Sequence, residues 1–171
     1  MKRRTATTKR MLLIAGVTMT LSVLALAVTK PNFSGTWTMD RGRSYGLPGN
    51  MNQTLTITHK DDQIELETKL IQPDNERVVK DTYILDGKEH EYTPQVPPNQ
   101  PPAKGKRTAI WLPEDKGIQV TEVTTAETPK GAVTTQVVRK WTISGQGELV
   151  IDMYVDNPNM SYEAKRIFKK Q

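Results

Sequence analysis

Apolar and polar residues alternate with a period of two through nearly the whole chain after Pro31, which restricts the fold more than any other feature does. Near the start of this region Phe33, Gly35, Trp37 and Met39 share one face, and polar residues stand between them. The alternation recurs near residues 54–58, 64–70, 77–85, 89–93, 107–112, 118–125, 133–144, 149–155 and 161–169. Because successive side chains of a strand point to opposite faces, this period predicts about nine or ten β-strands.

Residues typical of turns separate these segments. Examples are Asp86-Gly87, Gly145-Gln146-Gly147 and Asn157-Pro158-Asn159. Because such links are short, neighbouring strands are expected to pair as antiparallel hairpins. The sequence therefore predicts an all-β, antiparallel up-and-down meander. Closure into a barrel would remove the exposed edges of the sheet, and a two-sheet sandwich is the main alternative.

The first 27 residues have the order of a secretory signal peptide. A cationic head ends at Arg10, an apolar run follows over residues 11–28, and Ala25-Leu26-Ala27 provides a small-x-small cleavage site. We therefore expect a signal helix over residues 1–27, cleavage after Ala27, a periplasmic or secreted location, and one domain over residues 28–171. If the segment is not cleaved, it is the one part of the chain expected to contact a membrane.

Composition excludes several classes of function. The chain has 24 Lys and Arg residues against 19 Asp and Glu, but five of the basic residues lie before residue 11, so the rest is neutral. A neutral domain lacks the basic patch that nucleic-acid binding needs. There is no cysteine, and the two histidines, His59 and His90, are too few for a three-histidine metal centre. We find no catalytic motif and expect no enzyme activity, catalytic residue, cofactor or metal.

One short motif carries a family resemblance. The segment Phe33-Ser34-Gly35-Thr36-Trp37 resembles the opening strand of the calycin barrels, which include the lipocalins and the fatty-acid-binding proteins. The whole layout resembles secreted bacterial lipocalin-like proteins. The resemblance implies a structural motif in which Trp37 closes one end of the barrel and a late-strand arginine packs on its ring. An even number of strands would pair the last strand with the first and bring Arg166 to Trp37. In the fatty-acid-binding proteins an Arg-x-Tyr pair on the closing strand holds a carboxylate, and here Phe168 replaces that tyrosine.

Arg139 stands out because it shares a strand face with Val137 and Trp141. A guanidinium among inward apolar positions must be paired or solvated. It either binds the anionic end of a ligand, or stacks on Trp141 and closes the barrel, or lies on the outer face.

These observations predict a small-ligand-binding protein whose barrel holds an apolar or amphipathic molecule. The predicted ligand-binding residues are Arg139, Trp141, Leu55, Ile57 and Leu66. The alternative is an envelope or inhibitor-type protein with a filled barrel, which acts through loops such as the proline-rich residues 93–106.

Overall fold

The computed structural model describes residues 30–46, 51–73, 75–96, 103–129 and 131–171, and the predicted signal peptide lies outside them. The described residues form ten strands and two short 3-10 helices: β1 (Gly35–Met39), η1 (Arg41–Arg43), β2 (Asn52–Lys60), β3 (Gln63–Gln72), β4 (Asn75–Ile84), β5 (Glu89–Tyr92), β6 (Ala103–Trp111), η2 (Pro113–Asp115), β7 (Ile118–Thr128), β8 (Gly131–Ile143), β9 (Leu149–Asn157) and β10 (Met160–Lys170). None of the helices within these ranges has the length and apolar character needed to cross a bilayer.

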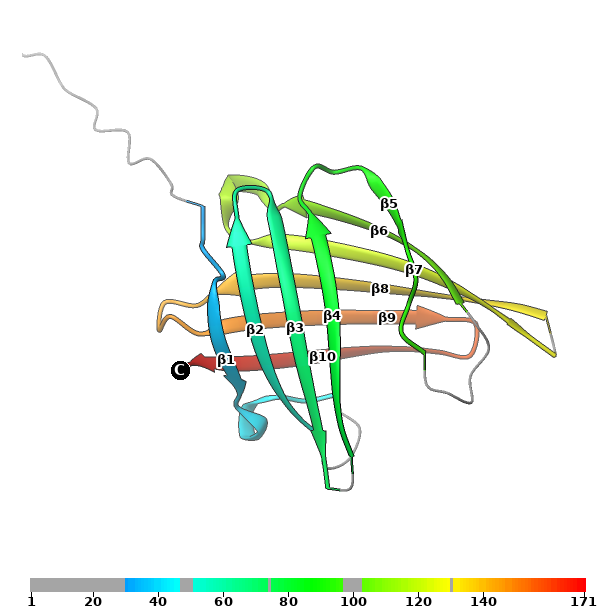
Figure 1. Ribbon diagram of the computed structural model, residues 1–171, viewed down its shortest axis with the longest axis horizontal. Helices are drawn as coiled ribbons and strands as arrows, with labels where there is room; N and C mark the ends of the chain where they lie inside the picture. Colours follow the sequence, from blue (N-terminus) through cyan, green and yellow to red (C-terminus); the bar gives the residue numbers. More distant parts are fainter. Residues whose placement is uncertain (1–29, 47–50, 74, 97–102, 130) are drawn as a thin grey trace, which may run out of the picture.

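All ten strands belong to one antiparallel sheet, in the order β4-β3-β2-β1-β10-β9-β8-β7-β6-β5. Every pairing but one joins strands that are consecutive in the chain, and the exception joins β1 to β10. The sheet curls so that β2, β3 and β4 cross in front of β7 to β10 (Figure 1). The predicted all-β antiparallel meander and the pairing of the first strand with the last are confirmed.

The sheet forms a half-barrel, because the expected complete closure is not reached between β4 and β5. The link between these two strands is bonded to both sides of the gap instead of forming a tight hairpin. The Leu85 amide donates to the Asp62 carbonyl at 2.7 Å, in the turn between β2 and β3, and the Gly87 amide donates to the Ala109 carbonyl of β6 at 3.1 Å. This link therefore spans the gap, which we call the seam.

The closure of β1 onto β10 corrects one predicted contact. The residue opposite Trp37 is Lys170, whose Nζ lies 5.3 Å from the centroid of the indole ring. Gly35 makes room for this side chain, since a Cβ added there would lie 2.6 Å from Lys170 Cε. Arg166 is four residues further back along β10, opposite Ile151. The cation over Trp37 is thus Lys170, and the expected stacking by Arg166 is wrong.

Aromatic rings fill one end of the half-barrel. The ring of Trp141 packs edge-on against Phe33 and Tyr83, with centroid distances of 6.1 and 5.8 Å. The buried Trp37 donates from Nε1 to the Phe33 carbonyl at 2.9 Å. Phe33 is also buried, so the predicted motif residues Phe33, Gly35 and Trp37 lie together at this end. That these residues close this end of the barrel stays a prediction.

His59 at this end is expected to make stability dependent on pH. Its Nδ1 accepts from the Phe33 amide at 3.3 Å, and its Nε2 donates to the Asp61 carbonyl at 3.1 Å, so the ring is neutral. Burial lowers the pKa of His59 below the ordinary 6.5. The unfolded chain therefore takes up a proton more readily, and the free energy of unfolding should fall as the pH decreases below about 6.5.

Urea unfolding at several pH values checks this prediction. The variant His59→Asn keeps an acceptor near the position of Nδ1 but does not titrate, so its free energy of unfolding should vary less between pH 7 and pH 5. A pH dependence identical to that of the wild type would contradict the assignment.

Candidate functional site

A cavity of about 250 Å³ lies under the inner face of the half-barrel. One part of its wall is apolar, formed by residues such as Leu55, Leu66 and Phe168. The rest is polar and holds three cationic side chains from three strands, Arg77 of β4, Arg139 of β8 and Arg166 of β10, together with one carboxylate, that of Asp81 on β4. The cavity thus offers an apolar wall and a set of guanidinium groups.

Four of the five residues predicted to bind a ligand line this cavity together: Leu55, Leu66, Arg139 and Trp141. Ile57 does not line it; its side chain is 3% exposed and packs in the core. The contact of these residues with a ligand stays a prediction.

Arg139 faces the interior, but a carboxylate already binds it. Its guanidinium is paired with Glu122 of β7, which also accepts from Arg107 at 2.7 Å. Burial opposes the charge on Arg139, yet Glu122 outweighs this effect and raises the pKa of Arg139 above its ordinary value. Of the three interpretations of Arg139, the outward orientation is excluded, and the guanidinium is held by an ion pair that sequence analysis did not anticipate.

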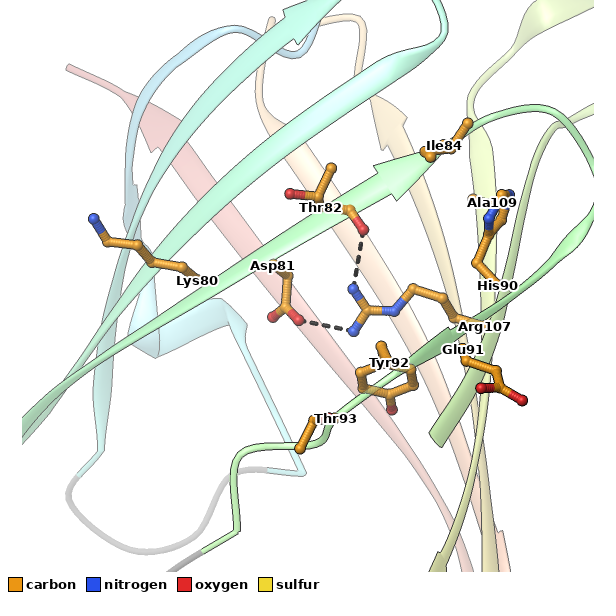
Figure 2. Close-up of a pocket in the computed structure, with 10 residues that line it drawn as sticks. All are labelled: Lys80, Asp81, Thr82, Ile84, His90, Glu91, Tyr92, Thr93, Arg107 and Ala109. Atoms are coloured by element: carbon orange, nitrogen blue, oxygen red, sulfur yellow. Dashed lines mark hydrogen bonds and ion pairs between the residues drawn. The ribbon is translucent and has the colours of Figure 1, made fainter. Parts of the chain in front are cut away.

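Arg107 ties the two sides of the seam together, as Figure 2 shows. From β6 it donates to the Thr82 carbonyl at 3.0 Å and to Asp81 at 2.8 Å, both on β4. Its guanidinium also lies 3.7 Å from the centroid of the Tyr92 ring of β5. β4 and β5 are not joined by backbone hydrogen bonds, and the Arg107 side chain connects the two strands instead. A groove of about 360 Å³ runs along this seam.

Arg166 differs from Arg107 and Arg139 in having no carboxylate partner among the described residues. Its side chain is largely buried and contacts the Met153 sulfur. Burial lowers the pKa of Arg166, and repulsion by the Arg139 charge lowers it further. This guanidinium therefore faces the cavity with its charge uncompensated.

Two further donors at the cavity lack a partner. Arg77 Nε and Trp141 Nε1 are buried and make no hydrogen bond within the described part of the chain. Arg77 also has no ion pair there, because the carboxylate of its own strand face, Asp81, lies four residues along β4 and is paired with Arg107. Unpaired buried donors are uncommon in folded proteins and call for an explanation such as a ligand or water.

Sequence analysis missed Arg77, Arg107 and Glu122, although the alternation contained a signal for two of them, Glu122 and Arg77. Glu122 shares a strand face with Ile118 and Val120, which is the same kind of anomaly that drew attention to Arg139. Arg77 likewise shares a face with Val79 and Tyr83. Among the described residues no group of His, Cys, Asp and Glu side chains is arranged to hold a metal ion.

Comparisons with known proteins give a structural likeness only. The sequence matches no protein-family model and no curated protein. Among solved structures it is similar to secretory abundant heat soluble protein 4 from Ramazzottius varieornatus, with a TM-score of 0.51 and 15% sequence identity, covering 84% of this chain and 96% of that one. At this identity the likeness shows a β-barrel-like fold shared over most of both chains.

Proposed function

We propose that this protein binds a small amphipathic acid inside its half-barrel, with the apolar body against the wall of Leu55 and Leu66 and the acid group at Arg166. The observation that carries the proposal is the partly buried guanidinium of Arg166, which faces the cavity with no carboxylate partner in the described residues. A buried cation without a counter-ion is costly, so an anionic ligand would relieve an existing penalty.

The cavity volume limits the size of this ligand. An apolar cavity of about 150 Å³ accommodates one benzene molecule, so a cavity of about 250 Å³ corresponds to roughly ten non-hydrogen atoms. This volume is a little under the ~300 Å³ at which pockets for drug-sized ligands begin. The proposed ligand is therefore a medium-chain acid such as octanoate.

In this proposal Arg166 binds the acid group of the ligand. Arg139 contributes less to the affinity, because Glu122 already neutralises the Arg139 charge. A hydrogen bond to a charged group contributes about 1.5–3 kcal/mol, which corresponds to roughly 10- to 150-fold in affinity. Phe168 follows at i+2 and offers a ring in place of a hydroxyl, so the position two residues after Arg166 supplies no phenol to the acid group.

Titration calorimetry with octanoate and with its neutral analogue 1-octanol tests the proposal. We expect the wild-type protein to bind octanoate at least tenfold more tightly than 1-octanol. The variant Arg166→Met should bind the two compounds with similar affinity. The control Lys165→Met changes the neighbouring residue, which is paired with Asp152 at 3.0 Å, and should leave the preference intact.

Two results would contradict the proposal. If neither compound binds the wild type, the interior is not a ligand site and the filled-barrel alternative gains support. If octanoate binds equally to the wild type and to Arg166→Met, the carboxylate is held elsewhere.

The proposed location is periplasmic or extracellular, and the proposed role is binding without catalysis. The order of residues 1–27 supports export, and the similar protein from Ramazzottius varieornatus carries the word secretory in its name. N-terminal sequencing of protein recovered outside the cytoplasm should find a chain that begins at Val28. A chain that begins at Met1 in that fraction would support a retained anchor instead.

A further inference from the structure

The interior of the half-barrel contains more positive than negative charge. Four guanidinium groups, those of Arg77, Arg107, Arg139 and Arg166, line the cavity or contact its lining, and the carboxylates among them are Asp81 and Glu122. This imbalance lies in a region where charges are partly shielded from water.

The two carboxylates and two of the arginines form one balanced cluster. Glu122 binds both Arg107 and Arg139, and Asp81 binds Arg107 from the other side of the seam. The cluster therefore leaves no negative charge for the other two arginines.

Arg77 and Arg166 thus remain without a counter-ion among the described residues. They approach the cavity from different strands, β4 and β10, which lie on the two crossing halves of the sheet (Figure 1). Arg77 Nε and Trp141 Nε1, whose side chains line the same cavity, are also buried donors with no acceptor in the described part of the chain. One carboxylate has a single negative charge and cannot neutralise both arginines.

We infer that the amphiphile bound in this cavity has a head group with two negative charges, such as a phosphate monoester, which Arg77 and Arg166 neutralise together. This inference rests on the proposed function and specifies the chemical class of its ligand. A phosphate monoester presents several acceptor oxygens and is dianionic above its second pKa of about 6. Arginine recognises such oxygens through its planar set of donors.

Octyl phosphate and octyl sulfate separate charge from shape, because both have a tetrahedral head group on the same chain but the sulfate has one negative charge. At pH 8 we expect octyl phosphate to bind the wild type at least tenfold more tightly than octyl sulfate. At pH 5, where the phosphate carries one charge, the ratio of the two affinities should approach one. Using this ratio removes any effect of pH on the stability of the protein itself.

Substitutions test whether Arg77 neutralises the second negative charge of the phosphate. Arg77→Met should bring the ratio at pH 8 close to one and leave the affinity for octyl sulfate nearly unchanged, whereas Arg166→Met should weaken both ligands. The matched control is Lys80→Met, which removes an exposed cation from the opposite face of the same strand. The control should keep the wild-type ratio.

The outcomes distinguish this inference from the proposed function. If none of the octyl compounds binds, the proposed function itself fails. If octyl sulfate and octyl phosphate bind equally tightly at pH 8, the protein binds amphiphilic anions but the inference of two charges is overturned. Inorganic phosphate is the last ligand to test. If it binds as tightly as octyl phosphate, the site is one for the free ion, and the inference of an amphiphilic ligand is overturned. Much weaker binding of inorganic phosphate supports the inference of an amphiphilic ligand.

Discussion

Replacing Glu122 by alanine should cost about 3–5 kcal/mol of the free energy of unfolding. Glu122 is the carboxylate that contacts both Arg107 and Arg139, and its side chain is 8% exposed. Its removal leaves two partly buried cations facing each other with Asp81 as the remaining counter-ion, and an uncompensated buried charge is strongly destabilising. Urea unfolding followed by circular dichroism measures the loss.

An exposed glutamate provides the matched control. Glu67 pairs with Lys80 at 3.0 Å on the outside of the sheet, where both side chains are largely in water. Glu67→Ala should therefore cost no more than about 1 kcal/mol. Equal costs for the two substitutions would mean that the interior cluster is as well solvated as the surface pair.

Replacing Trp37 by alanine is expected to have an effect of similar size, about 3–5 kcal/mol. The indole is 2% exposed, and its Nε1 donates to the Phe33 carbonyl, so the substitution creates a cavity and also leaves a buried carbonyl without its donor. The change should appear as a lower midpoint of urea unfolding.

Trp111 is the control for this second prediction. It packs at the edge of the core, and its Nε1 donates to Asp62 at 3.0 Å in an exposed contact. Trp111→Ala should cost about 1–2 kcal/mol. A cost below about 1 kcal/mol for Trp37→Ala would contradict the role of Trp37 as the residue that closes the core.

Strand positions were predictable because the alternation is local and strong. The segment predicted at residues 133–144 is β8, Gly131–Ile143, and the segment predicted at 149–155 is β9, Leu149–Asn157. Burial on one face of each strand enforces the same period in the sequence and in the structure. The face of Arg139 followed from this period, even though its partner did not.

Register and ion pairing were not predictable in the same way. Alternation assigns Arg166 and Lys170 to the same face of β10 but does not say which of them meets Trp37, because that depends on where the ladder with β1 begins. The pairing of Arg107 with Asp81 depends on how far the sheet curls, since it joins strands that are not neighbours in the sheet. The seam is equally a property of the whole sheet, which the turn residues Asp86-Gly87 do not reveal.

The pairing of β1 with β10 also has a consequence for how the chain folds. Apart from β4 and β5, strands that follow one another pair across links short enough to close at little entropic cost, whereas β1 and β10 must meet across nearly the whole described chain. The Gln171 amide donates to the Thr36 carbonyl at 2.9 Å, so even the last residue takes part in this junction. Eight pairings can thus form between strands that are consecutive in the chain. The ninth joins the residues that are furthest apart in sequence, such as Trp37 and Lys170, which makes it the step expected to limit the folding rate.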